Sequence, residues 1–180
     1  MQRIAVIGCA GSGKSTFARR LGRVLGIEAT HLDAWYWRPG WVPTPREEWR
    51  RVQHRLVAGE RWIIDGNYAA TLDIRLEQAD TIVFFDLPRH SCLLGLLRRW
   101  ARHRGRPLQA PGCPERLSWE LARWVVRYRR HSRPKVLAAI ARHAPQAQLI
   151  MIATRQAAGD TLKRAASAAP HAVEAYSPRP

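Results

Sequence analysis

Short runs of apolar residues recur along the chain, and longer stretches separate them in which apolar positions repeat every three or four residues. A short continuous apolar run is typical of a strand that is covered on both faces. Each of these runs therefore predicts a buried β-strand. The predicted strands are Ile4–Ile7, Ile27–Leu32, Trp62–Ile64, Thr81–Phe85 and Gln148–Ala153.

The stretches between the runs predict helices, because their apolar residues fall on one face of a 3.6-residue repeat. Phe17, Leu21 and Val24 mark a first helix that begins near Lys14. At Thr44–Glu47, a capping threonine, a proline in the first helical position and a glutamate three residues after the cap predict another helix start. Further helices are predicted over Ser91–Arg102, from Leu117 to a break near Pro134, over Val136–His143 and over Thr161–Ala169.

Strands that alternate with helices predict an α/β fold, a three-layer doubly wound parallel five-stranded sheet with helices on both faces. Two segments predict loops: the aromatic stretch from Trp35 to Trp41, and Arg104–Pro114 with its Gly and Pro residues. In a chain of 180 residues we expect one domain over 1–169 and a flexible tail over 170–180. Ligands of such sheets bind beyond the carboxyl ends of the strands, so the site is expected there.

The segment Gly8–Thr16 reads Gly-Cys-Ala-Gly-Ser-Gly-Lys-Ser-Thr and fits the phosphate-binding pattern G-x-x-x-x-G-K-[S/T]. A strand is predicted before it and a helix after it. This context lets backbone N–H groups and the helix N-terminus face a phosphate, whereas a glycine-rich turn that matches by chance needs no such flanks. We therefore predict that ATP binds here. The predicted ATP-binding residues are Gly8, Gly11, Ser12, Gly13, Lys14, Ser15, Thr16 and Arg155.

Three aspartates, Asp33, Asp65 and Asp86, directly follow or end predicted strands. A single aspartate there can simply cap the next helix. Three on the edge that carries the phosphate loop favour a metal or acceptor contact for at least one of them. Lys14 is predicted to reach the β- and γ-phosphates, and the Ser15 hydroxyl to ligate Mg²⁺.

The formal net charge is +16, and much of the excess lies between Arg89 and Lys135, where Glu115 and Glu120 are the only acids. Such a surface attracts polyanions, from multiply phosphorylated ligands to nucleic acid. No run is long enough to cross a membrane, and the first residues enter a strand at once. Together with three cysteines far apart in sequence, Cys9, Cys92 and Cys113, this predicts reduced thiols and a cytoplasmic location.

Several of these motifs resemble adenylate kinase and related small kinases. The phosphate loop, Ile63-Ile64-Asp65-Gly66, Phe85-Asp86-Leu87-Pro88 and an Arg-rich helix–loop–helix follow in the same order. Over residues 1–155 the chain is most similar to the DNA topology modulation (FlaR-like) group. The stretches that carry this similarity are His31-Leu32-Asp33, Trp37, Trp41, Asp65-Gly66-Asn67-Tyr68, Gly112-Cys113-Pro114-Glu115 and Arg133-Pro134. The resemblance implies strand order 2-3-1-4-5, ATP at the phosphate loop and a mobile lid over about 98–133.

The resemblance also implies roles for individual residues. Asp65 is expected to assist Mg²⁺ through water, so the predicted metal site is Ser15 with Asp65. Independently of the resemblance, the position of Asp33 after a buried strand predicts that it faces the acceptor side and accepts a hydroxyl proton. Adenylate kinases place an Arg soon after Asp-Gly to hold the acceptor's phosphate, whereas here Asn67 and Tyr68 follow and the first Arg is Arg75.

The position of an early lid arginine in adenylate kinases corresponds to Gly95 in this sequence. We therefore expect Arg98, Arg99 or Arg102 to take the role of that arginine. Because arginine holds phosphate through a fork of donors and stays charged, a lid rich in arginine suits phosphoryl transfer. Any one of these arginines can instead be a solvated surface charge. The predicted catalytic residues are Lys14, Asp33, Arg99 and Arg133.

Two functional hypotheses follow. The first, which we favour, is an ATP-dependent kinase acting on a small-molecule acceptor. The second is an ATP-regulated nucleic-acid-binding protein, and at this charge some non-specific binding of nucleic acid is expected in either case. Core packing and base stacking are both open for Trp35, Trp37 and Trp41. The histidines lack metal-ligand spacing, and none of them, His31 included, is assigned a role.

Overall fold

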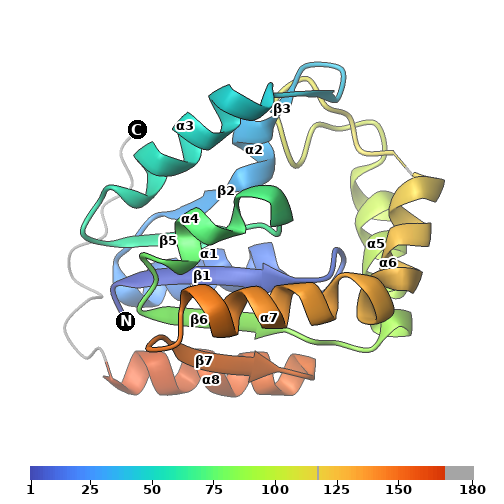
Figure 1. Cartoon of the computed structure of the whole chain (residues 1–180). Coiled ribbons are helices and arrows are strands. Elements are labelled where there is room, and N and C mark those ends of the chain that lie inside the picture. Colours follow the sequence, from blue (N-terminus) through green and yellow to red (C-terminus); the bar gives the residue numbers. More distant parts are fainter. Residues whose placement is uncertain (117, 169–180) are drawn as a thin grey trace.

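The computed structural model describes residues 1–116 and 118–168. Its main sheet contains β1 (Arg3–Gly8), β2 (Ala29–His31), β5 (Trp62–Asp65), β6 (Thr81–Phe85) and β7 (Gln148–Ile152). All pairings in this sheet are parallel, in the order β2-β5-β1-β6-β7. When only these five strands are counted along the chain, this is order 2-3-1-4-5, as the resemblance implied, and the strands point toward one edge (Figure 1).

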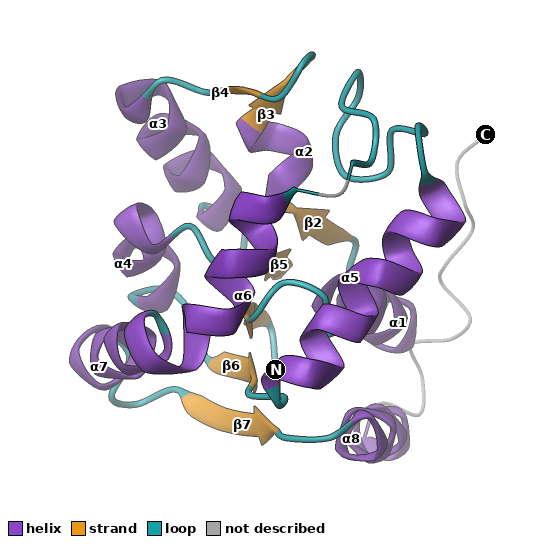
Figure 2. Ribbon diagram, turned by 90° about the vertical axis from the view of Figure 1, so that its right-hand side faces the viewer, coloured by secondary structure: helices purple, strands orange, loops and turns teal. Residues whose placement is uncertain are grey.

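Helices cover both faces of the sheet and make it the middle of three layers. Figure 2 looks along the strands, with α3 (Arg46–Val57), α4 (Leu72–Leu76) and α7 (Arg133–His143) on one side. On the other side lie α1 (Lys14–Leu25) and α8 (Arg155–Ala168), with α5 (Arg89–His103) and α6 (Trp119–His131) near the carboxyl ends of the strands. This confirms the predicted fold class. In the described residues, no helix combines the length and the apolar character needed to cross a bilayer.

The strands read as apolar runs because their side chains enter one of two buried layers. In β6, Ile82 and Phe84 pack toward α3, α4 and α7. Val83 and Phe85 pack toward α1, α5 and α6. Both faces exclude water, so alternation of apolar and polar residues disappears from these strands.

The segment predicted as an aromatic loop is instead ordered secondary structure. Leu32–Tyr36 forms a short helix, α2, and β3 (Trp37–Arg38) pairs antiparallel with β4 (Val42–Pro43) to form a hairpin. Leu32 is fully buried and Tyr36 packs on the same core layer, so the two residues anchor one helical turn. As a consequence, β2 ends at His31, and the predicted strand Ile27–Leu32 was too long.

One predicted helix cap and one predicted helix start were wrong. The Thr44 hydroxyl does not cap α3; it donates to the carbonyl of Tyr36 at 2.7 Å and closes the hairpin, and α3 begins at Arg46. The last helix, α8, begins at Arg155 rather than Thr161, because the Thr154 hydroxyl accepts a hydrogen bond from the Ala157 N–H at 3.0 Å. The Leu117 start and the 170–180 tail lie outside the described residues.

A short 3₁₀ turn, η1 (Ala69–Thr71), joins the end of β5 to α4. The break predicted near Pro134 falls at Ser132, between α6 and α7, and Pro134 occupies the first turn of α7. The predicted lid, about 98–133, therefore comprises the end of α5, the connection that follows it and α6. Its movement stays a prediction.

Candidate functional site

The phosphate loop joins β1 to α1 at the carboxyl edge of the sheet, where the motif places it. Gly13 has φ 97°, a left-handed conformation that suits glycine, and it stands at the N-terminus of α1. The Lys14 ammonium donates to the carbonyl of Cys9 at 3.1 Å and so lies against the loop. The Ser12 hydroxyl is buried and has no hydrogen-bond partner among the described residues. An orphaned donor inside a loop of glycines fits a phosphate group.

Asp65 ends β5 beside this loop and is the best-placed residue for a cation. Burial alone raises the pKa of a carboxylate, but the His31 hydrogen bond, the Lys14 charge and the Ser15 hydroxyl together hold the pKa of Asp65 below its usual value. The Ser15 hydroxyl lies near the carboxylate, and among the described residues the Oδ1 atom is buried without a hydrogen-bond partner. An ionised, unsatisfied carboxylate oxygen next to a hydroxyl fits hydrated Mg²⁺.

The residues fit a cation that keeps part of its water shell, because the protein supplies few metal ligands. Within the described residues, no cluster of three or more His, Cys, Asp or Glu side chains is present that could hold an ion without other ligands. Mg²⁺ usually binds through one or two protein groups together with substrate phosphates. Ser15 in the first turn of α1 and Asp65 at the end of β5 match that requirement, and the structure places the two side chains near each other.

Asp33 lies in the first turn of α2 and accepts a hydrogen bond from the Tyr68 hydroxyl. Burial raises the pKa of Asp33, and the nearby Asp65 charge adds to that, while the Tyr68 hydrogen bond and the charges of Lys14 and Arg99 oppose it. The net shift is upward. A carboxylate with a raised pKa near Lys14 suits contact with a hydroxyl group that loses its proton.

Arg75 organises the turn that carries these residues, a role that the sequence did not reveal. Its side chain is fully buried, and its two terminal nitrogens donate to the carbonyls of Gly66 and Asn67 at 2.7 Å each. Burial lowers the pKa of Arg75 to about 10. Within this turn the Asn67 amide oxygen accepts from the Gly8 N–H of the phosphate loop at 2.9 Å, and Tyr68 adopts φ 36°. One guanidinium thus supports the metal side, the phosphate loop and the acceptor side together.

The arginines predicted to act in catalysis are both paired with carboxylates. Arg99 donates to the buried Glu115 at 2.8 Å. The Arg133 guanidinium bonds both oxygens of Asp86 at 2.9 Å, which accounts for the third strand-end aspartate. Thr16 and Arg155 are both exposed, Thr16 in the first turn of α1 and Arg155 at the start of α8.

No protein-family model matches this sequence, and no curated protein matches it by sequence. Solved structures match its fold. An unliganded sugar kinase from Janibacter sp. HTCC2649 has a TM-score of 0.58 at 19% identity, covering 98% of this chain and 99% of that one. A shikimate kinase from Acinetobacter baumannii in complex with shikimate has a TM-score of 0.58 at 18% identity, covering 91% and 90%. This is the P-loop kinase fold.

A gluconokinase from Sinorhizobium meliloti 1021 also shares the P-loop kinase fold, with a TM-score of 0.53 at 17% identity over 93% of this chain and 94% of that one. At such identities the likeness establishes the fold alone. Because a fold does not determine function, the function of this chain depends on the residues of its site.

On this P-loop kinase fold, α5 lies directly on the phosphate loop. A Cβ atom added to Gly95 would stand 2.0 Å from the Gly11 carbonyl oxygen, and one added to Gly11 would stand 2.1 Å from the Cys92 carbonyl oxygen. No side chain fits at either position. Gly95 occupies the position at which adenylate kinases carry a lid arginine. Its contact with the phosphate loop backbone leaves no room for an arginine side chain there.

The β3–β4 hairpin reaches across and bonds the connection between α5 and α6. The Gly40 N–H donates to the Gly112 carbonyl at 3.0 Å, and the Trp41 indole donates to the Pro114 carbonyl at 3.1 Å. The Cys113 thiol donates to the Arg38 carbonyl at 3.2 Å. We call these three bonds, between Arg38–Trp41 and Gly112–Pro114, the clasp; Figure 1 shows the two segments meeting.

Packing, one of the two uses left open above, accounts for two of the three tryptophans of the aromatic stretch. Trp37 and Trp41 pack edge to face with their ring centroids 5.5 Å apart, and Trp41 also joins the clasp. Both therefore serve packing. Trp35 projects with 52% of its surface exposed, so it belongs to no core.

The structure brings together two cysteines that are distant in sequence. Cys9 of the phosphate loop and Cys92 of α5 are both buried in one apolar cluster, and all three cysteines are free thiols. The neighbouring Cys92 thiol and burial together raise the pKa of Cys9, and the Cys92 thiol donates to the Leu87 carbonyl at 3.9 Å. No local pattern in the sequence predicts this neighbourhood.

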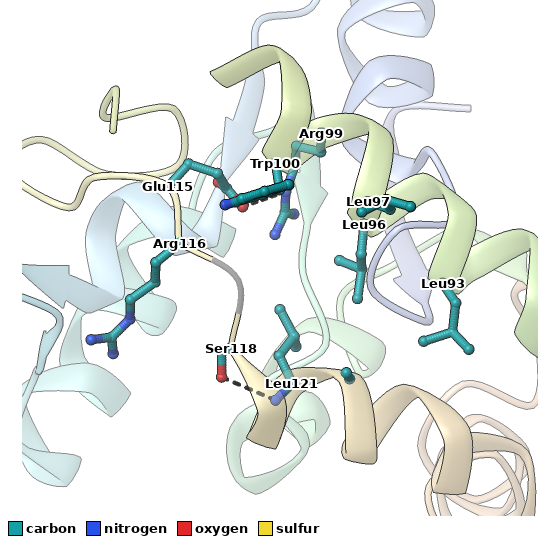
Figure 3. A pocket seen from close by; sticks show the side chains of 10 residues that line it. Leu93, Leu96, Leu97, Arg99, Trp100, Glu115, Arg116, Ser118 and Leu121 are labelled. Carbon is teal, nitrogen blue, oxygen red and sulfur yellow. Dashed lines mark hydrogen bonds and ion pairs between the residues drawn. The ribbon is translucent and has the colours of Figure 1, made fainter. Parts of the chain in front are cut away.

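A cavity of about 70 Å³ lies between α5 and α6, away from the phosphate loop residues. Figure 3 shows apolar side chains such as Leu93 and Leu97 along it and the Arg99–Glu115 pair at one end. Its lining lacks Lys14, Ser15, Asp33 and Asp65. The cavity therefore lies between the two helices of the predicted lid region and does not include the phosphate loop.

Proposed function

We propose that this protein is an ATP-dependent phosphotransferase that moves the γ-phosphoryl group of ATP to a hydroxyl group of a small molecule. The observation that carries the proposal is the buried, unpartnered Asp65 Oδ1 beside Ser15 and Lys14. This trio supplies a phosphate-binding cation and a site for Mg²⁺, which neutralises phosphate charge when bound. Gly8, Gly11, Ser12, Gly13 and Thr16 complete the phosphate loop in this proposal.

Asp33 receives the acceptor. Its carboxylate holds and orients the acceptor hydroxyl and takes up the hydroxyl proton, while Tyr68 fixes the carboxylate in place. The raised pKa of Asp33 favours this role, because a base is most effective when its pKa approaches the working pH.

The hydrogen bonds of Arg75 are evidence against an acceptor that already contains a phosphate group. In adenylate kinases an arginine after Asp-Gly holds that phosphate, whereas here the first arginine is buried and its two terminal nitrogens bond carbonyls. We therefore propose a hydroxyl compound without a phosphate group. The neighbours named for sugar, shikimate and gluconate chemistry agree with a hydroxyl acceptor, and the kinship to adenylate kinases and the FlaR-like group rests on motifs alone.

The arginines of the segment 98–133 act on the transferred group. Arg99 already contributes its charge at Asp33, and Arg133 exchanges Asp86 for phosphate when the segment closes. Guanidinium groups held in place stabilise the charge of the transition state. Arg155 lies beside the nucleotide in this arrangement.

The experiment is a panel of acceptors with Mg·ATP, scored by ADP release. It includes sugars, hydroxy acids and nucleoside monophosphates, with wild type, Lys14→Ala and Lys163→Ala side by side. Lys163 is exposed on α8 and controls for loss of a lysine. Acceptor-dependent ADP release that disappears only in Lys14→Ala supports the proposal. Phosphorylation of nucleoside monophosphates alone contradicts the acceptor class, and nucleic-acid binding without any acceptor-dependent release contradicts the kinase function.

A further inference from the structure

His31 ends β2 and lies opposite Asp65, which ends β5, in the register of the parallel pair. Its Nδ1 atom is 3.0 Å from the Asp65 Oδ2 atom. Because an ionised carboxylate only accepts hydrogen bonds, Nδ1 carries the proton in this contact. The second nitrogen of a neutral imidazole, Nε2, then presents a lone pair.

Two acceptor atoms of this pair are buried without a partner. Among the described residues neither the Asp65 Oδ1 atom nor the His31 Nε2 atom finds a donor. Buried polar atoms are rarely left in this state in native proteins. Lys14, whose charge acts on Asp65, directs its ammonium to the Cys9 carbonyl instead. Each of the two atoms therefore needs a donor that the described residues do not supply.

The missing donors match the water shell of a bound cation. Mg²⁺ keeps several of its water molecules in protein sites, and those waters donate to the side chains around them. The Ser15 hydroxyl, a ligand of the proposed Mg²⁺ site, lies by the same carboxylate. The several water molecules of a cation held at Ser15 and Asp65 would supply donors of the kind that these two acceptors need.

We infer that His31 is a positioning residue for Mg²⁺, an inference that rests on the proposed use of Mg·ATP. Its Nδ1–H fixes Oδ2 of Asp65, so that Oδ1 is turned to the water shell, and its Nε2 accepts from a metal-bound water. His31 itself is not a metal ligand. It acts through Asp65 and through water, as the partners of ligating carboxylates commonly do.

The test is calorimetric titration of the full chain with a non-hydrolysable ATP analogue, AMP-PNP, over a range of free Mg²⁺ and also in EDTA. His31→Leu removes both contacts. We expect it to raise the Mg²⁺ concentration needed for half-maximal tightening by about 10- to 100-fold, the usual loss for a partner of a metal ligand. Affinity in EDTA is expected to stay unchanged, because the phosphate loop is intact.

His31→Asn separates the two contacts, since its amide N–H replaces Nδ1–H but nothing replaces Nε2. We expect it to recover a substantial part of the Mg²⁺ response. The matched control is His143→Leu: His143 Nδ1 also bonds a carboxylate, Glu77 at 3.1 Å, on the surface. This control is expected to behave as wild type.

Unchanged Mg²⁺ dependence in His31→Leu, or an equal loss of affinity with Mg²⁺ and in EDTA, overturns the inference. So does a wild-type affinity that ignores Mg²⁺. Should circular dichroism show that His31→Leu does not fold, the Mg²⁺ dependence of His31→Asn is compared with that of His143→Leu. A weaker Mg²⁺ response in His31→Asn supports the inference, and an equal response overturns it. Absence of phosphoryl transfer to any acceptor, with these Mg²⁺ effects present, contradicts the proposed function and leaves the inference standing.

Discussion

Asp33 and Tyr68 form a pair in which each side chain changes the proton affinity of the other. Burial raises the pKa of Asp33, and the Tyr68 hydroxyl opposes the rise by donating to the charged form. Tyr68→Phe removes that donor, so the pKa of Asp33 is predicted to rise further. A ¹³C NMR titration of the Asp33 carboxyl measures this. Tyr36→Phe changes the neighbouring ring, 4.6 Å away between centroids, and is the control; a fall in the Asp33 pKa in Tyr68→Phe contradicts the assignment.

Arg75 is predicted to be essential to stability through hydrogen bonds that lysine cannot replace. In Arg75→Lys one ammonium cannot satisfy both the Gly66 and Asn67 carbonyls, and a buried unpaired carbonyl costs about 1–3 kcal/mol. Urea unfolding is expected to show a loss of that size. Arg50→Lys is the control, because Arg50 is only loosely paired with Asp73 at 3.8 Å, and exposed pairs contribute less than about 1 kcal/mol. Equal losses in both variants would refute the role of Arg75.

At this scale the sequence predicted the residues that a local motif defines. Lys14 and Ser15 follow from the loop pattern, and Asp65 follows from its place after a strand. His31 and Arg75 were missed, because their partners lie 34 and 9 residues away and no spacing rule connects them. A histidine on a strand end looks the same in sequence whether it faces solvent or a carboxylate.

The contact of α5 with the phosphate loop is an interaction between elements, and glycine makes it possible. Gly95→Ala puts a methyl group within 2.0 Å of the Gly11 carbonyl, so α5 must move away from the loop. We predict lower stability and weaker binding of AMP-PNP, measured by thermal unfolding and calorimetry.

The matched control is Gly159→Ala. Gly159 lies inside α8 and a Cβ there meets nothing within 4 Å, so the gain in helix propensity is expected to stabilise the protein by about 0.5–1 kcal/mol. The critical result is a loss of stability in Gly95→Ala together with a gain of stability in Gly159→Ala. If Gly95→Ala also stabilised the protein, α5 would not rest on the loop.

Prediction of elements succeeded where burial on both sides leaves a continuous apolar run, as in Thr81–Phe85, whose bounds agree with β6. It failed at Leu32–Pro43, because aromatic residues there serve a short helix and a hairpin that only tertiary packing stabilises. It also failed at Thr44, whose hydroxyl donates across the hairpin to Tyr36 instead of accepting from the helix. Capping patterns do not reveal such competition.

For the whole molecule, the clasp links the acceptor side to the predicted lid. Closure of 98–133 over ATP should therefore reach the hairpin. We predict that AMP-PNP with Mg²⁺ slows amide hydrogen exchange in 98–133 and also in 37–43, measured by mass spectrometry. Trp41→Phe removes the indole donor to Pro114 and is expected to weaken protection of 37–43 more than that of 98–133.

Trp119→Phe is the control for this experiment, because Trp119 is 70% exposed and does not bond the hairpin. Protection confined to the phosphate loop would show that neither the segment nor the hairpin responds to nucleotide. Protection of 98–133 without protection of the hairpin would show that the clasp does not transmit the effect of nucleotide to the hairpin.

The burial of every cysteine means that the folded protein resists thiol reagents. A buried thiol reacts only while a local opening exposes it, so the alkylation rate measures the frequency of that opening. Cys113 lies in the clasp, and Cys92 lies where α5 meets the phosphate loop. The chain thus carries its own chemical probes at the clasp and at the contact of α5 with the phosphate loop. The order in which those thiols become labelled gives the order in which the two contacts open.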